Sequence, residues 1–200
     1  MLTCNKFYID PVVVWCVGSS IIKRAFVYAR TRPDGPNLGL KRFPVDIWWQ
    51  GYGGLRLKNL QRQLQTLVKV NGKHPKYIII HCGGNDIGFT KVHKIREYVV
   101  DAFKFVNEHI SGAKIIWSQI LPRSVWRYST NNKAMHLIRL RINNFAAHQA
   151  QLSGGDYIKH IDLKRVDDTL FLNDGVHLSH SGNEIFLNKI AAELSRIVSA

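Results

Sequence analysis

The sequence has 200 residues, with 28 Lys and Arg against 14 Asp and Glu, and a formal net charge of +14. Hydrophobic residues make up 46% of it, which is enough to bury a sizeable core and excludes a wholly disordered chain. The length predicts a single domain over residues 1–200, with a core from about 12 to 198.

The cysteines and the N-terminal segment indicate the cellular compartment in which the protein is expected. Cys4, Cys16 and Cys82 cannot all pair, and no Cys-x-x-Cys motif is present, which argues against a disulfide scaffold or a zinc ribbon. No apolar run reaches the ~18 residues that span a bilayer. Asp10 and Pro11 interrupt the pattern that a signal peptide needs. We expect a cytoplasmic protein without a transmembrane segment.

Short apolar runs alternate with segments of helical periodicity. The runs cover residues 12–17, 45–49, 77–82, 113–120 and 157–161, and each is typical of a buried strand. Apolar residues spaced three and four apart predict helices over 57–67, 95–106, 135–145 and 186–197, and a further helix is expected after Ser20. This alternation predicts an α/β fold, a three-layer α/β/α sandwich around a parallel sheet of about five strands.

Residues 30–42 and the basic residues around them suggest further roles. The segment holds two Pro and two Gly, which predicts a long loop, either a lid over a substrate or a plain surface excursion. Residues 1–76 hold 13 of the 28 basic residues and 3 of the 14 acidic ones. Such a surface can bind nucleic acid or another polyanion through phosphate contacts, although it can also be merely solvated.

Ligands of an open parallel sheet bind beyond the carboxyl ends of its strands, so the residues after each run matter most. The first run leads into Gly18-Ser19-Ser20, where a serine can act as a nucleophile or simply cap a helix. The second leads into Gly53-Gly54, whose backbone N–H groups can face a ligand or lie in a loose loop.

Two more polar segments complete this set. The third run leads into Gly83-Gly84-Asn85-Asp86, where Asn85 can offer an amide donor or form part of a turn. Asp174 and His177 are three residues apart, so the carboxylate can orient the ring within one turn, although such a pair is common by chance. Together the segments offer a nucleophile, N–H donors, a base and its orienting acid, as acyl transfer requires. No His or carboxylate cluster has metal-ligand spacing, and we expect no metal and no cofactor.

The order of these segments resembles the blocks of the SGNH hydrolases, also called GDSL-type esterases, from about residue 12 to 198. The resemblance implies that Ser20 is the nucleophile, His177 the base and Asp174 its partner. It also implies an oxyanion hole that contains Asn85 and Gly54, with Gly53 as the alternative to Gly54. Leu178-Ser179 follows the histidine, as is often seen in the family. Ser19 stands where the family usually has Asp, a residue that supports the loop and that the triad does not need.

A narrower resemblance involves the segments 17–20 and 48–54, which are similar to SGNH-type domains associated with animal retroelements. It would make the chain a fragment of a larger polyprotein, or a gene copied from one. The family resemblance predicts hydrolysis of a small-molecule or lipid ester. Four aromatic residues flank the expected site and could line an acyl pocket or belong to the core: Trp48, Trp49, Tyr52 and Phe89.

Two alternatives to an esterase stay open from the sequence. One is an SGNH-fold module with a weak or inactive site that binds nucleic acid through its basic surface. The other is a scaffold that keeps the fold without activity. The presence of Ser20, Asn85, Asp174 and His177 favours the esterase, whereas the departure at Ser19 favours the scaffold.

Overall fold

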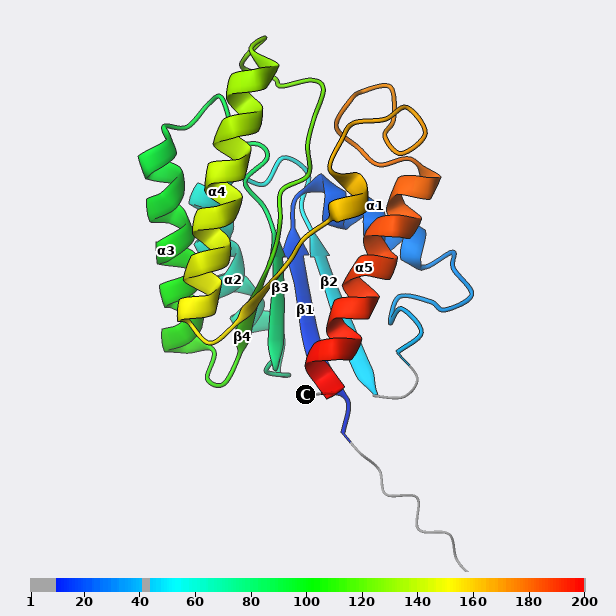
Figure 1. Ribbon diagram of the computed structural model, residues 1–200. Helices are drawn as coiled ribbons and strands as arrows, with labels where there is room; N and C mark the ends of the chain where they lie inside the picture. The colour runs from blue at the N-terminus through cyan, green and yellow to red at the C-terminus, as the bar shows by residue number, and fades with distance from the viewer. Residues whose placement is uncertain (1–9, 41–43, 200) are drawn as a thin grey trace, which may run out of the picture.

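The computed structural model describes residues 10–40 and 44–199. Within them, five strands form one fully parallel sheet in the order β2-β1-β3-β4-β5 (Figure 1). The strands are β1 (Val12–Gly18), β2 (Val45–Gly51), β3 (Tyr77–His81), β4 (Lys114–Ser118) and β5 (Asp156–Ile158). The predicted parallel sheet of about five strands is confirmed.

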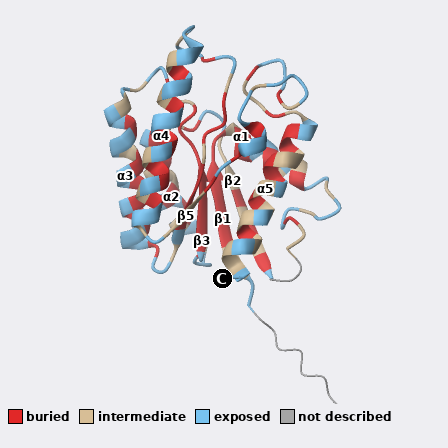
Figure 2. Cartoon of the chain, viewed as in Figure 1, coloured by how far each residue is buried: buried red, intermediate tan, exposed pale blue. Residues whose placement is uncertain are grey.

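Five helices cover the two faces of this sheet, which confirms the three-layer prediction (Figure 1). One face carries α2 (Leu60–Val70), α3 (Val92–His109) and α4 (Asn132–Leu152), and the other carries α1 (Ser20–Ala29) and α5 (His180–Ser199). Each helix buries one stripe, as Figure 2 shows, because its apolar residues recur every three or four positions. In α2 the buried residues are Leu60, Leu64 and Leu67. Burying a leucine contributes about 1.5–3 kcal/mol relative to leaving it exposed.

Two strands, β4 and β5, end earlier than the predicted apolar runs. The fourth run was expected to continue to residue 120, but β4 ends at Ser118. The Asn143 side chain of α4 accepts a hydrogen bond from the Ile120 N–H (2.8 Å) and donates one to the Ile120 carbonyl (3.0 Å). A side chain thus replaces a neighbouring strand as the partner of this backbone. The fifth run was expected over 157–161, but β5 ends at Ile158 and a 3-10 turn (Ile161–Leu163) follows.

The described part of the predicted loop, residues 30–40, packs along the outer edge of β2. The Asn37 side chain accepts a hydrogen bond from the Ile47 N–H (2.9 Å), and the Trp49 indole donates one to the Pro36 carbonyl (2.9 Å). Covering an edge strand in this way protects it from pairing with another chain. Residues 41–43 of the predicted loop lie outside the described residues.

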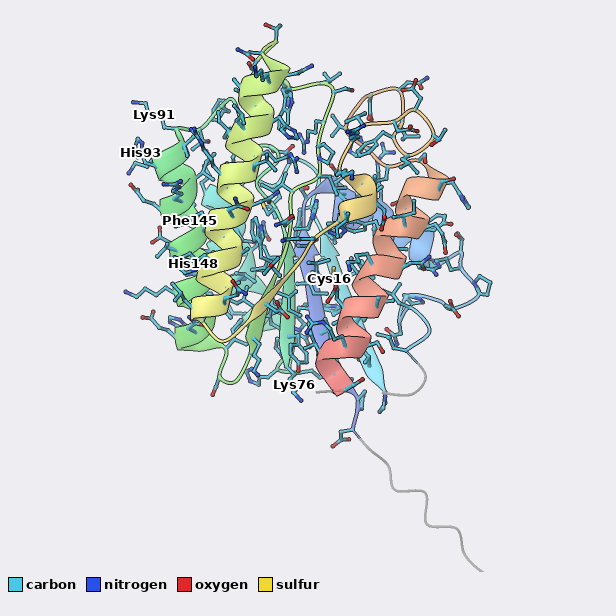
Figure 3. The ribbon with its side chains drawn as sticks, in the orientation of Figure 1. Cys16, Lys76, Lys91, His93, Phe145 and His148 are labelled. Carbon is cyan, nitrogen blue, oxygen red and sulfur yellow. The ribbon has the colours of Figure 1, made fainter. Side chains whose placement is uncertain are left out.

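Two cysteines lie in the described residues, and both are buried and unpaired. Cys16 lies on β1 within the sheet (Figure 3), and Cys82 follows β3 directly. Burial raises the pKa of both thiols, so both stay protonated. Cys4 lies outside the described residues. Over the described part of the chain, no helix is both long and apolar enough to cross a membrane.

A buried polar network joins the exits of three strands. The Ser118 hydroxyl lies 3.0 Å from His81 Nδ1 and 2.8 Å from His160 Nε2, so it donates to one ring and accepts from the other. Burial lowers the pKa of His81 to about 3, and it lowers the pKa of His160 well below its ordinary value. Both rings are therefore neutral in the folded protein.

The neutral histidines predict a fold that weakens in mild acid. Between the folded and unfolded pKa values the unfolded chain binds protons that the folded chain does not, so the free energy of unfolding falls as pH drops below ~6.5. For each histidine, lowering the pH from about 7 to 5 costs about 2 kcal/mol. Urea unfolding of His160→Gln should therefore lose about 2 kcal/mol less than the unmodified chain over that interval. Equal losses in the two proteins would contradict the prediction.

Asp86 has the opposite effect on the free energy of unfolding within the same pH range. Burial raises the pKa of its carboxyl to about 6, against hydrogen bonding from the Leu57 N–H, which lowers it. In mild acid the folded chain therefore takes up this proton more readily than the unfolded chain, which offsets part of the loss from the histidines. The comparison with His160→Gln removes this contribution, because Asp86 is present in both proteins.

Candidate active site

Ser20 is the first residue of α1 and follows β1 through Gly18 and Ser19. The turn is tight because β3 lies alongside: a Cβ on Gly18 would sit 2.3 Å from the His81 carbonyl oxygen. The Ser19 N–H donates to that same oxygen at 3.1 Å. Ser19 takes the N-cap position, but its side chain makes no capping hydrogen bond. The helix-cap interpretation therefore does not account for Ser20, which stands within the helix.

Asp174 and His177 lie in the segment between β5 and α5, and they meet within one turn as predicted. Asp174 Oδ1 accepts hydrogen bonds from the Val176 N–H (2.9 Å) and the His177 N–H (2.8 Å). Asp174 Oδ2 lies 2.6 Å from His177 Nδ1. Desolvation raises the pKa of Asp174, but these hydrogen bonds outweigh it and lower the pKa to about 2. Asp174 is therefore a carboxylate at neutral pH.

The opposite nitrogen of the same ring reaches the serine. His177 Nε2 lies 2.8 Å from Ser20 Oγ, across a sequence separation of 157 residues. With Asp174 on Nδ1, the ring carries its hydrogen on Nδ1 and offers Nε2 as an acceptor for the Ser20 hydroxyl. Asp174, His177 and Ser20 thus form one hydrogen-bonded series at the carboxyl edge of the sheet.

Asn85 and the two candidate glycines lie around this series. The Tyr52 N–H donates to the Gly18 carbonyl at 2.8 Å, which holds the glycine loop beside the serine turn. Gly53 lines the cavity that contains Ser20 and His177, whereas Gly54 lines a second cavity with Asn85. The structure therefore brings all the predicted site residues to one edge, with Gly53 and Gly54 facing different cavities.

The Asn85 side chain is held by contacts at both ends. One N–H of its amide donates to the Leu55 carbonyl at 3.1 Å. Its oxygen accepts from two nitrogens of the Arg123 guanidinium, at 3.3 and 3.4 Å. These contacts fix which end of the amide is the donor, and the second N–H is left to bind another acceptor.

Asp86, the neighbour of Asn85 in the motif, is fully buried and binds the backbone just after the glycine loop. One of its carboxylate oxygens accepts a hydrogen bond from the Leu57 N–H at 3.0 Å. The contact ties the segment after Gly54 to the segment that carries Asn85. Asp86 is thus a positioning residue of this edge.

Arg123 is a residue of the site that the sequence analysis missed. It follows Pro122 just beyond β4, at the carboxyl edge where the other polar segments lie. The sequence could have indicated Arg123, because the residues after the fourth predicted strand lie at the same edge of the sheet as those after the first three. The Ser124 N–H next to it donates to the Gly175 carbonyl at 3.0 Å, which joins this segment to the Asp174 turn.

A cavity of about 630 Å³ opens at the serine and is lined on one side by α1 and on the other by the histidine segment. Its lining includes Lys23, Arg24 and Val27 of α1, and Thr31 is its contribution from the described part of the 30–42 loop. The Trp48, Trp49 and Tyr52 side chains do not line it but pack in or against the cores. Phe89 is exposed.

Another cavity, of about 390 Å³, lies at the opposite edge of the sheet, near Lys76 (Figure 3), Lys114 and Arg196. It lies at the amino ends of the strands, and it contains none of the predicted site residues. Over residues 10–40 and 44–199, no group of three or more His, Cys, Asp or Glu side chains could hold a metal ion.

A three-layer α/β/α sandwich with Asp, His and Ser hydrogen-bonded in series at its carboxyl edge has the arrangement of a serine hydrolase. The chain belongs to the GDSL-like lipase/acylhydrolase family, whose model matches residues 19–190. That membership supports ester hydrolysis as the general activity. No curated protein matches the sequence.

Solved structures share the fold at low sequence identity. The acetyl xylan esterase AlAXEase is similar with a TM-score of 0.71 and 16% identity, over 91% of this chain and 99% of that one. A GDSL-like lipase from Bacteroides thetaiotaomicron has a TM-score of 0.67 and 16% identity, over 93% and 89%. The psychrotrophic esterase EstA from Pseudoalteromonas sp. has a TM-score of 0.69 and 13% identity, over 94% and 100%. At these identities the likeness establishes the fold.

Proposed function

We propose that this protein hydrolyses carboxylic esters through a covalent acyl-enzyme on Ser20. The observation that carries the proposal is the series of short contacts from Asp174 Oδ2 to His177 Nδ1 and from His177 Nε2 to Ser20 Oγ, at 2.6 and 2.8 Å. A nucleophile within hydrogen-bond reach of a base, which is oriented in turn by a third group, is the constellation that activates a serine hydroxyl.

In the first half of the reaction, Ser20 Oγ attacks the ester carbonyl carbon while His177 Nε2 takes the hydroxyl proton. A tetrahedral intermediate forms, and its breakdown expels the alcohol, which receives the proton back from His177. In the second half, water attacks the acyl carbon while His177 Nε2 takes a proton from it, and a second tetrahedral intermediate forms. Its collapse breaks the bond to Ser20 Oγ, which receives the proton from His177, and the carboxylic acid leaves. The Asp174 carboxylate stabilises the imidazolium that accompanies each tetrahedral intermediate.

The negative charge of the tetrahedral oxygen needs donors that are already in place. The second amide N–H of Asn85 can supply one, because Leu55 and Arg123 hold the side chain in a fixed orientation. The backbone N–H groups of Ser20 and Gly54 are proposed as the others. Ser20 lies at the N-terminus of α1, where the helix dipole also favours a negative charge.

The experiment that tests the proposal combines turnover with labelling. Purified protein should hydrolyse a short-chain chromogenic ester, and a phosphonate should label Ser20 covalently, since the similar esterase EstA is described as inhibited by monoethylphosphonate. Mass spectrometry of the labelled peptide identifies the residue. Ser19→Ala is the matched control, because Ser19 is adjacent and its side chain makes no capping contact. Folded protein that neither hydrolyses esters nor takes the label would refute the proposal.

Asn85→Ala tests the oxyanion assignment separately. Removing one such donor costs roughly 10²–10³ in kcat, because the lost interaction forms only as charge develops on the oxygen. The expected change is in kcat rather than KM, with the thermal unfolding temperature measured alongside. If Asn85→Ala turns over at the unmodified rate, Asn85 has no part in the oxyanion hole.

A further inference from the structure

A small cavity of about 70 Å³ lies beside the two proposed oxyanion residues, Gly54 and Asn85. Three arginines line it, Arg56, Arg123 and Arg127, and no acidic side chain does. We call it the arginine pocket. It lies next to the larger cavity lined by Ser20 and His177, because Gly53 lines that cavity and the adjacent Gly54 lines this pocket.

The arginines of this pocket form no ion pair with a carboxylate of the described residues. Among the described residues, no carboxylate lies within 4.0 Å of these three guanidinium groups. Arg123 makes only long hydrogen bonds to the neutral Asn85 oxygen. Burial lowers the pKa of Arg123 to about 10, because desolvation outweighs the attraction of the Asp174 and Asp86 carboxyls, neither of which lies within 4.0 Å of the guanidinium. A charge withdrawn from water without a partner is costly, and an incoming anion would relieve that cost.

The guanidinium groups of Arg56 and Arg123 also make defined contacts before any ligand arrives. Arg123 lies against the backbone of Gly84, where a Cβ would be 2.4 Å from its Nη2, so a larger residue at this position would displace the guanidinium. Arg56 stacks on Phe89, with its guanidinium carbon 3.8 Å from the ring centroid, and donates to the Tyr128 hydroxyl at 2.8 Å. Groups fixed in this way lose little entropy when they bind a ligand.

We propose that the arginine pocket binds an anionic group, a carboxylate or a phosphate, carried by the ester that this protein hydrolyses. The planar fork of arginine matches both groups through paired hydrogen bonds. Because Arg123 touches Asn85, the anionic group lies close to the ester carbonyl, on either its acyl or its alcohol side. This inference rests on the proposed esterase function and names the substrate class of that site.

Two simpler roles for these arginines predict different results. Arg123 could act only by orienting Asn85, in which case its loss slows charged and neutral esters equally. The arginines could also act only as part of the general positive field of a chain with net charge +14. In that case, removing any cation near the cleft has the same effect, since such a field is not tied to one position.

The probes are matched pairs of esters that differ in one charge. 4-Nitrophenyl hydrogen adipate, with a carboxylate at the end of its acyl group, is compared with 4-nitrophenyl methyl adipate. Acetoxyacetate, with the carboxylate on the alcohol side, is compared with ethyl acetoxyacetate. In at least one pair the charged ester should be preferred about 10- to 100-fold in kcat/KM, the range of one or two charge-assisted hydrogen bonds. The pair that shows the preference identifies the side that carries the charge.

Three variants assign the preference to the pocket. Arg127→Gln should reduce the preference, which is measured as the ratio of the two kcat/KM values within each pair of esters; Arg127 is exposed and lies over the Tyr128 ring. Arg123→Gln should remove it, with a further loss on both esters through Asn85. Arg24→Gln is the matched control, because it removes an exposed charge that lines the other cavity. It should leave the preference intact.

Each failure has its own signature. If the unmodified protein hydrolyses the neutral esters and shows no preference in either pair, the arginine pocket is not an anion subsite, although the esterase function stands. An equal loss of preference in Arg24→Gln and Arg127→Gln would likewise overturn the proposal in favour of a general field. If no ester in the panel is hydrolysed by folded protein, the proposed function itself fails, and the inference with it.

Discussion

Ser20→Ala should lower kcat for ester hydrolysis by about 10⁶, the size of the loss when the nucleophile of a serine hydrolase is removed. Alanine removes the only atom that can form the acyl-enzyme, and His177 then has no hydroxyl to deprotonate. The contact that the structure gives to the Ser20 hydroxyl is the one to His177, so the variant should fold normally. Steady-state kinetics with thermal unfolding as the accompanying measurement would establish both points.

Ser19→Ala again serves as the control for this variant. It changes the neighbouring buried serine and should retain most of the turnover, since the Ser19 side chain makes no capping contact. If folded Ser20→Ala kept the rate of the unmodified chain, the nucleophile would have to be another residue. A loss shared equally by the two variants would indicate damage to the turn after β1 rather than removal of a nucleophile.

Asp174→Asn should lower kcat by about 10⁴ while leaving KM nearly unchanged. The amide has the shape of the carboxylate and can still accept the two backbone hydrogen bonds from Val176 and His177. It cannot stabilise the imidazolium, and its own N–H would favour the ring tautomer with hydrogen on Nε2. In that tautomer Nε2 can no longer accept the proton of Ser20.

Asp167→Asn is the matched control for Asp174→Asn. The Asp167 carboxyl accepts hydrogen bonds from the Thr169 hydroxyl and the Thr169 N–H, and these contacts lower its pKa, but it makes no contact with His177. It should therefore keep its turnover. If Asp174→Asn lost no more activity than Asp167→Asn, then Asp174 would only support its loop.

The sequence predicted the layers of this fold well because its helices and strands are patterned by burial. The leucines spaced three and four apart in α2 are buried, as their spacing indicates, and all five residues of β3 are buried. The end of β4 was less accurate, because the Asn143 side chain of α4 binds the backbone of Ile120, and β5 ends before a 3-10 turn. Tertiary contacts of that kind leave no periodic signal in the sequence.

The candidate site was predicted unevenly for a similar reason. Ser20, Asn85, Asp174 and His177 stand in short motifs with fixed spacing, and the structure brings all four to one edge. Arg123 stands alone after Pro122, and one arginine among 28 basic residues has no distinctive sequence signature. Its importance comes from its desolvation and its contact with Asn85, which only the folded structure reveals. Binding of nucleic acid, suggested by the net charge, stays a prediction.

The distance along the chain between Ser20 and His177 makes hydrolysis a measure of completed folding. The nucleophile Ser20 and its base His177 are separated by 157 residues, so the serine is synthesised well before the histidine. A chain interrupted before Asp174 would carry a serine with nothing to activate it. Ester turnover would therefore report on docking of the segment that carries Asp174 and His177 against β1 and α1 during refolding.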